Sequence, residues 1–281
     1  MLKIAVPNKG SLSEAAIAML KECGYRVRRE PKELVITDAD NEIEFFYLRP
    51  RDIAVYVGSG TLQAGITGRD LLLDSEANAV EIMSLGFAGS TFRFAARPGT
   101  ASGVEELHGK RIATSYPGLV RAHLARHDVQ ATVVRLDGAV ETSITLGVAD
   151  VIADVVETGT TLRNQGLEPF GAPVMHSEAV LISRHDDADL PGLRVLARRL
   201  EGVVTARTYV MVDYDVRAEL VEQACAITPG LESPTVSPLH DKNSVAVRAM
   251  VKRQGVNRVM DSLYALGARG ILVTDIRACR L

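Results

Sequence analysis

Tryptophan is absent from the 281-residue sequence, and cysteine is scarce, with Cys23, Cys225 and Cys279 far apart. Their number is odd and their spacings are not those of a zinc or redox site, so we expect reduced thiols in a cytosolic protein. The six phenylalanines and seven tyrosines are scattered, which leaves no platform for stacking nucleic-acid bases. Basic residues number 32 against 35 acidic ones, and the formal charge of −3 argues against nonspecific binding to nucleic acid.

Long apolar runs are also missing. No segment approaches the roughly 18–20 uninterrupted apolar residues of a membrane span. Near the start, Ile4 to Val6 form an apolar stretch too short for a secretory signal. We therefore expect a cytoplasmic protein without a membrane segment. Hydrophobic residues make up 47% of the sequence, which is globular composition, and the length predicts about two domains.

Short apolar runs alternate with helical patterns over the first two thirds of the chain. Residues 2–6 are expected to form a strand, and the capping-box spacing of Ser11 and Glu14 predicts a helix that ends near Gly24. The alternation continues with strands at 42–48, 64–67, 111–114, 132–136 and 151–156 and helices at 119–126 and 140–146. This order is typical of an α/β fold with parallel sheets.

A different order begins after about residue 207. The expected elements are strands at 209–212, 235–239, 244–251 and 270–276, and helices at 217–227 and 256–266. The order β-α-β-β-α-β is that of a ferredoxin-like split βαβ unit, so we expect a small separate domain over residues 208–281.

The segment from Asp154 to Leu162 has the chemistry of a phosphate-binding loop. It leaves a buried strand, turns through Gly159 and enters a helix, whose first N–H groups have no partner within the helix. Threonines at 158, 160 and 161 add hydroxyl donors, and the glycine lets the backbone approach an anion. The same residues also fit an ordinary threonine-rich helix cap.

A longer stretch around this loop resembles one family. Residues 141–162, ETSITLGVADVIADVVETGTTL, match the signature of the ATP phosphoribosyltransferases, which catalyse the first step of histidine biosynthesis. The C-terminal βαββαβ pattern resembles the long form of that family. Further matching motifs follow one another nearly from end to end: VPNKG at 6–10, LRPRD at 48–52, GITGRD at 65–70, SYP at 115–117 and ITPGLESPT at 227–235.

The resemblance implies that N1 of the adenine of ATP displaces pyrophosphate from 5-phosphoribosyl 1-diphosphate, with inversion at the sugar carbon. Such a reaction needs alignment and stabilisation of the departing pyrophosphate more than a strong base, so no single catalytic base is assigned. Mg²⁺ is the expected cofactor, held mainly by substrate phosphates, and its protein ligands stay open. The family also implies a homo-oligomer, a dimer or hexamer.

The implied fold is a two-lobed core like that of type II periplasmic binding proteins, followed by a regulatory domain. Residues 1–90 and 184–207 would form one lobe, residues 91–183 the other, and residues 208–281 the regulatory domain.

The resemblance also assigns residues to the two substrates. The phosphoribosyl group would be bound by Asp154, Glu157, Thr158, Gly159, Thr160 and Thr161. ATP would be bound by Lys9, Gly10, Arg49, Asp70 and Glu141. Arg51 and Arg69 occupy similar loops at strand ends, where ligands of α/β sheets bind. Each basic residue also fits a solvated charge or a surface ion pair, and Asp70 and Glu141 also fit helix N-terminal charges.

By the same resemblance, histidine inhibits the enzyme through the C-terminal domain. An acid such as Asp215 would suit its amino group, and hydroxyls would add further hydrogen bonds. The assigned effector residues are Asp213, Asp215, Leu231, Ser233 and Thr235. Aspartate, serine and proline are also ordinary turn residues, and that interpretation stays open.

Other interpretations fit part of the sequence. A non-catalytic two-lobed sensor of an amino acid or nucleotide has similar lobes, and a phosphoribosyltransferase for a free base shares the phosphate loop. His123 and His127 have the spacing of metal ligands on a helix, but the sequence lacks the glutamate of the zinc motif and places Arg121 and Arg126 beside them. We therefore do not expect zinc there.

Overall fold

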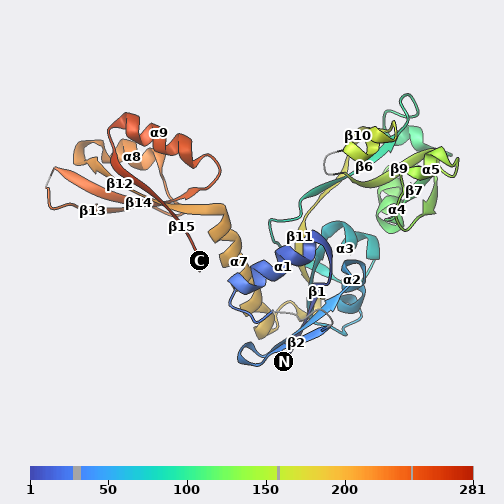
Figure 1. Ribbon diagram of the computed structural model, residues 1–281, viewed down its shortest axis with the longest axis horizontal. Coiled ribbons are helices and arrows are strands. Elements are labelled where there is room, and N and C mark those ends of the chain that lie inside the picture. The colour runs from blue at the N-terminus through green and yellow to red at the C-terminus, as the bar shows by residue number, and fades with distance from the viewer. Residues whose placement is uncertain (28–32, 157–158, 242, 281) are drawn as a thin grey trace. The chain divides into compact units, whose positions relative to one another are not determined.

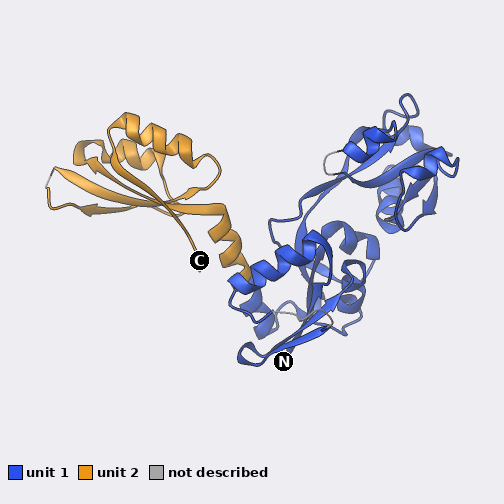
Figure 2. Cartoon of the chain, in the orientation of Figure 1, with its two compact units in different colours: residues 1–197 blue, residues 198–281 orange. Residues whose placement is uncertain are grey.

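The computed structural model describes residues 1–27, 33–156, 159–241 and 243–280 (Figure 1). The chain divides into two compact units, residues 1–197 and 198–281 (Figure 2). The division lies within helix α7 (Pro191–Thr208), whereas the expected domain boundary coincides with the end of that helix. The expected domain limits stay a prediction.

The first unit contains two sheets. The first sheet has the order β2-β3-β1-β4-β11-β5. Its strands are β1 (Leu2–Pro7), β2 (Val35–Asp38), β3 (Ile43–Leu48), β4 (Ala64–Gly68), β5 (Val80–Ser84) and β11 (Ala179–Ser183). Strands β3, β1 and β4 are parallel. Helix α1 (Gly10–Glu22) follows β1, α2 (Pro50–Gly58) follows β3, and α3 (Arg69–Ser75) follows β4.

The second sheet has the order β10-β6-β9-β7-β8, with β7 parallel to both β8 and β9. Its strands are β6 (Ser90–Ala96), β7 (Arg111–Thr114), β8 (Thr132–Arg135), β9 (Val151–Val156) and β10 (Glu168–Ser177). Helices α4 (Pro117–Arg126), α5 (Thr142–Thr145) and α6 (Thr160–Asn164) belong to it. Short 3₁₀ helices lie at Ala39–Asn41, Val104–Leu107, His185–Asp187 and Ala218–Leu220.

The chain passes from the first sheet to the second after β5 and returns after β10, along the paired strands β6 and β10 (Figure 1). We call the parts built on the first and second sheets the first and second lobe. The expected two-lobed α/β core is confirmed. Strand β11 pairs in the first sheet, although the expected division grouped residues 179–183 with the second lobe.

Each lobe packs its helices against its own sheet. In α2, Ile53, Ala54 and Val57 share one face at helical spacing and are fully buried against Ala5 and Val180. Burying a valine- or isoleucine-sized side chain stabilises a fold by about 1.5–3 kcal/mol, so this face fixes α2 on the sheet.

The expected capping box at the start of α1 is wrong. The helix begins at Gly10 with Lys9 as its N-cap, so Ser11 lies inside the first turn. Gly10, with φ of +76°, turns the chain into the helix, so the N-cap lies two residues earlier than the sequence pattern indicated. Ser13 instead ties the helix to the strand, because its Oγ donates a 2.6 Å hydrogen bond to the Pro7 carbonyl oxygen.

The second unit is an antiparallel sheet of order β13-β14-β12-β15 with two helices. Its elements are β12 (Tyr209–Arg217), α8 (Val221–Ile227), β13 (Thr235–Pro238), β14 (Ser244–Lys252), α9 (Val256–Leu266) and β15 (Arg269–Asp275). Alternate residues of β12, from Val210 to Val216, are buried in the core that includes Leu263 of α9. The expected ferredoxin-like βαββαβ unit is confirmed. Within the described ranges, no helix is long and apolar enough to cross a membrane.

Candidate active site

Most of the residues expected to bind ATP follow the parallel strands of the first lobe. Lys9 and Gly10 follow β1, Arg49 follows β3, and Asp70 follows β4. Parallel strands end at one edge of a sheet, so the structure brings these residues to the same edge. Lys9, Gly10 and Arg49 are exposed there, whereas Asp70 is buried, with 7% of its surface accessible.

The expected phosphate loop follows β9 in the second lobe. Glu157 and Thr158 lie outside the described residues. Gly159 has φ of +69° and is the N-cap of α6, with Thr160 and Thr161 exposed behind it. Leu162 is buried and anchors the helix to the core. The loop borders a pocket of about 290 Å³, whose lining includes Glu141, Asp154, Gly159, Thr160 and Thr161.

Asp154 lies at the end of β9 in an unusual electrostatic environment. Burial raises its pKa, and the carboxylates of Glu141 and Asp70 add to the rise. The backbone N–H of Val155, which donates a 2.8 Å hydrogen bond to Asp154 Oδ1, and the charge of Arg51 act in the opposite direction. Residues expected to bind two different substrates are therefore close enough to influence one another's charge.

Tyr116 joins this cluster from the segment after β7. Burial raises the pKa of its phenol, as do the charge of Asp70 and a hydrogen bond to that carboxylate. Its ring meets Phe92 edge-on at 5.2 Å, and the Arg51 guanidinium lies 4.8 Å from the ring centroid. Asp70 and Arg51 belong to the first lobe and Tyr116 to the second, so the two lobes meet around this ring.

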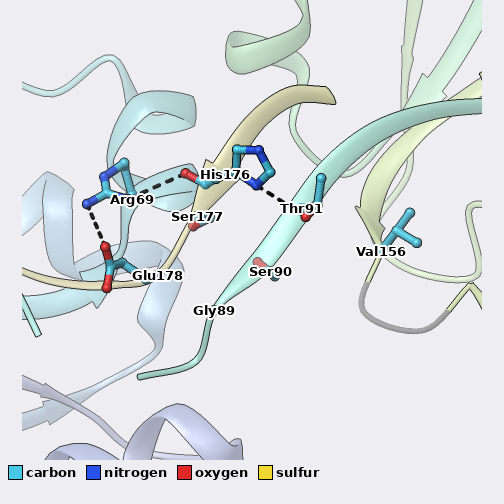
Figure 3. A pocket seen from close by; sticks show the side chains of 8 residues that line it. All are labelled: Arg69, Gly89, Ser90, Thr91, Val156, His176, Ser177 and Glu178. Atoms are coloured by element: carbon cyan, nitrogen blue, oxygen red, sulfur yellow. Dashed lines mark hydrogen bonds and ion pairs between the residues drawn. The ribbon is translucent and has the colours of Figure 1, made fainter. Parts of the chain in front are cut away.

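Arg69 is held by carboxylates of its own lobe and of the segment that links the lobes. Its guanidinium forms a two-pronged ion pair with Glu81, with both N···O distances 2.8 Å. It also approaches Glu178 at 3.2 Å, as Figure 3 shows. The hydrogen bond to Glu81 raises the pKa of Arg69. Of the two interpretations left open for Arg69, the structure supports the ion pair.

A second pocket of about 630 Å³ adjoins the phosphate loop. It is lined by residues that include Ser90 and Thr91 of β6, His176 and Ser177 of β10, and Val156 of β9 (Figure 3). Val156 also lines the pocket at the loop, so the two hollows are neighbours. His176 Nδ1 lies 3.4 Å from Thr91 Oγ1, and Ser177 Oγ accepts a 3.0 Å hydrogen bond from the Asp70 N–H.

Comparison with known proteins gives the same assignment over the whole chain. Residues 49–202 match the family model described as ATP phosphoribosyltransferase, and residues 206–278 match the model of the HisG C-terminal domain. The ATP phosphoribosyltransferases of Arthrobacter sp. strain FB24 and Streptomyces avermitilis are 64% and 65% identical to it, with 100% of each chain covered. The chain belongs to the ATP phosphoribosyltransferase family.

A solved structure agrees with the fold of the catalytic core. The ATP phosphoribosyl transferase (HisG:HisZ) complex from Thermotoga maritima matches with a TM-score of 0.63 and 27% identity, over 73% of this chain and 98% of that chain. The family resemblance expected from the motifs is thereby confirmed. The comparisons support the catalytic interpretation, transfer of the phosphoribosyl group of 5-phosphoribosyl 1-diphosphate to ATP with release of pyrophosphate, over the sensor interpretation.

The expected effector residues lie on the second unit of the chain. Asp213 and Asp215 project from β12, and Thr235 begins β13. Asp213 forms an ion pair with Arg248, with 2.6 Å between Oδ1 and Nε. Asp215 is exposed beside Gly270, where a Cβ would lie 3.4 Å from its Oδ2. Leu231 and Ser233 lie exposed in the segment before β13.

Three residues near the site were missed by the sequence analysis. Tyr116 was part of a motif but was given no role, although it follows β7 as the phosphate loop follows β9. Arg163 lies beside the loop, since its Nη2 is 3.3 Å from Thr160 Oγ1, a spacing of three residues on one helix. Asp74, on α3, reaches the second lobe and is described below. Of the three, only Tyr116 could have been identified from the sequence, by its position just after a predicted strand.

Proposed function

We propose that the loop at Gly159 binds the 5′-phosphate of 5-phosphoribosyl 1-diphosphate. Support comes from the left-handed backbone of Gly159, the exposed hydroxyls of Thr160 and Thr161, and the guanidinium of Arg163 beside them. Hydrogen bonds to a charged group contribute about 1.5–3 kcal/mol each, so three or four suffice for selective binding. Glu157 and Thr158 belong to the same proposed loop.

Asp154 would hold the ribose hydroxyls at the start of that loop. Burial raises its pKa, which means that the protein disfavours the charged carboxylate. Hydroxyl groups of a bound ribose would donate hydrogen bonds to that carboxylate and so stabilise its charged form. The pyrophosphate would then face the cleft between the lobes. The observation that carries the proposal is that Asp154, Gly159, Thr160 and Thr161 line one pocket of about 290 Å³.

ATP would be bound between the lobes, with Lys9, Gly10, Arg49 and Asp70 on one side and Glu141 on the other. The exposed basic residues Lys9 and Arg49 provide local positive charge on an otherwise acidic chain. The protein's contribution is then to align N1 of adenine with the sugar carbon and to stabilise the departing pyrophosphate.

Mg²⁺ is the proposed cofactor. The described residues contain no group of three or more His, Cys, Asp or Glu placed to hold a metal ion. Mg²⁺ typically binds through substrate phosphates with one or two protein carboxylates and waters, and we propose that mode here. Glu141 and Asp154 line the proposed site, and Asp70 lies close enough to raise the pKa of Asp154. The ion would neutralise charge on the leaving pyrophosphate.

Histidine is the proposed feedback inhibitor, bound on the second unit by Asp213, Asp215, Leu231, Ser233 and Thr235. Asp213 already pairs with Arg248, so Asp215 is the carboxylate better placed to meet an ammonium group. We further propose a cytoplasmic homo-oligomer, a dimer or hexamer.

The test is release of pyrophosphate by the purified chain with Mg²⁺, ATP and 5-phosphoribosyl 1-diphosphate. Omission of any one of the three should abolish release, and added histidine should reduce it. Release without Mg²⁺ would contradict the cofactor, and release insensitive to histidine would contradict the regulation.

A further inference from the structure

Helix α4 of the second lobe takes its cap from the first lobe. Within the described part of the chain, its own N-cap residue, Tyr116, makes no side-chain capping hydrogen bond. The carboxylate of Asp74, on α3, instead accepts hydrogen bonds from the N–H groups of Gly118 (2.9 Å) and Leu119 (3.2 Å). A carboxylate there satisfies N–H groups that the helix leaves unpaired and complements its positive end.

The same carboxylate anchors Arg51. Asp74 Oδ2 lies 3.0 Å from Arg51 Nη1, which also donates a 2.7 Å hydrogen bond to the carbonyl oxygen of Ser115 in the second lobe. The Asp74 side chain is only 9% exposed, so this charge is held mainly by protein groups. The guanidinium above Tyr116 is thus fixed by one residue from each side of the contact.

Gly118 lets the lobes approach closely at this contact. A Cβ at that position would collide with the carbonyl oxygen of Asp74 and would lie 3.2 Å from Glu76 Oε1. The end of α3 and the start of α4 therefore meet backbone to backbone.

Asp70 and Asp74 are four residues apart on α3 and so share one face of that helix. Both face the second lobe: the charge of Asp70 raises the pKa of Tyr116 there, and Asp74 accepts hydrogen bonds from Gly118 and Leu119. The Asp74 contact therefore lies one helical turn from a residue proposed to bind ATP.

We propose that Asp74 is a positioning residue that holds the two lobes together around ATP. The inference rests on the proposed placement of ATP between the lobes and of the phosphoribosyl group on the second lobe alone. Without Asp74, fewer molecules have both halves of the ATP site assembled, and the apparent affinity for ATP falls in proportion to that fraction. Saturating ATP restores the assembled state, so kcat is retained.

The test compares Asp74→Ala, Asp74→Asn and the control Glu14→Gln, which changes an exposed carboxylate on α1 of the same lobe. Asp74→Ala should raise KM for ATP about tenfold, given a typical cap contribution together with the lost Arg51 pair. Asp74→Asn keeps an oxygen for the N–H groups of α4 and should raise KM for ATP less. For Asp74→Ala, kcat and the calorimetric Kd for 5-phosphoribosyl 1-diphosphate should stay within about twofold of wild type.

An unchanged KM for ATP in folded Asp74→Ala would overturn the proposal. If kcat and Tm fell at the same time, Asp74 would only stabilise the fold. A rise in Kd for 5-phosphoribosyl 1-diphosphate equal to the rise in KM would also overturn it. If Asp74→Ala does not fold, an unchanged KM in Asp74→Asn has the same meaning. Failure of the proposed phosphoribosyl site is detected separately, by a Gly159 variant that retains binding.

Discussion

Asp154 on β9 lies directly opposite Arg93 on β6, yet the Arg93 guanidinium donates its 2.6 Å hydrogen bond to the carbonyl oxygen of Gly171. The carboxylate of Asp154 is thus left at the end of a buried strand, where burial raises its pKa. A raised pKa means that the folded chain disfavours the charged carboxylate. The resulting loss of stability is present above the folded pKa and disappears as the pH falls through it.

Asp154→Asn should therefore raise Tm at neutral pH, by about 2–4 °C for each 1 kcal/mol relieved, while binding of 5-phosphoribosyl 1-diphosphate weakens. The gain in Tm should shrink as the pH is lowered toward the folded pKa. Thermal unfolding as a function of pH measures it, and a lower Tm for Asp154→Asn at neutral pH would contradict the interpretation.

Asp150, which immediately precedes the first residue of β9, is the matched control, because its pKa is shifted in the opposite direction. A hydrogen bond from Arg111 lowers its pKa from 3.8 to about 2. Its contribution to stability is present above the unfolded pKa and is lost as the pH falls through about 2. Asp150→Asn should lower Tm slightly at neutral pH, because both side chains are more than a third exposed and water screens the pair.

The buried pair Tyr214 and Thr228 predicts a stability effect confined to the second unit. The two hydroxyl oxygens are 2.7 Å apart, and the residues are 1% and 0% exposed. Thr228→Val keeps the shape but leaves the Tyr214 hydroxyl without this partner, at a cost of about 1–3 kcal/mol. Denaturant unfolding should show the loss, whereas Thr228→Ser, which keeps the hydroxyl, should lose less. Equal stability of the Val variant and wild type would contradict this role.

Asp215 predicts a separation of regulation from catalysis. Asp215→Ala should keep pyrophosphate release but lose inhibition by histidine, because the variant lacks the carboxylate proposed to meet the ammonium group. Asp261→Ala, on the exposed side of α9, serves as the control and should remain inhibited. Dose–response curves with histidine measure both, and inhibition of Asp215→Ala at wild-type concentrations would remove Asp215 from the effector site.

The strand ends that carry the proposed site were predictable because they depend on local patterns. A buried apolar run followed by Gly159 and threonines indicates a strand, a turn and a helix, and the structure has β9 and α6 there. The βαββαβ order of the second unit was equally predictable from the sequence. The start of α1 was not, because the capping-box pattern at Ser11 competes with the turn that Gly10 makes possible.

Contacts between distant residues were beyond the sequence patterns. Arg69 looked like a cation for substrate phosphates, but Glu178, which is 109 residues away, helps to hold it. Asp74 meets Gly118 across 44 residues, and no local spacing marks that pair. Which carboxylate neutralises which cation is decided by strand order and lobe packing, which local patterns do not report.

The most direct measurement of the central claim is calorimetric binding of 5-phosphoribosyl 1-diphosphate to Gly159→Ala and Gly166→Ala. Both glycines have positive φ, +69° and +67°, so alanine imposes similar backbone strain at the two ends of α6, whereas only Gly159 lines the proposed phosphate pocket. Gly159→Ala should lose at least about tenfold in affinity, because a tenfold change corresponds to about 1.4 kcal/mol, close to the net contribution of one charge-assisted hydrogen bond. Gly166→Ala should bind like wild type. Wild-type affinity in Gly159→Ala, or equal loss in both variants, would contradict the claim that this loop binds the phosphoribosyl group.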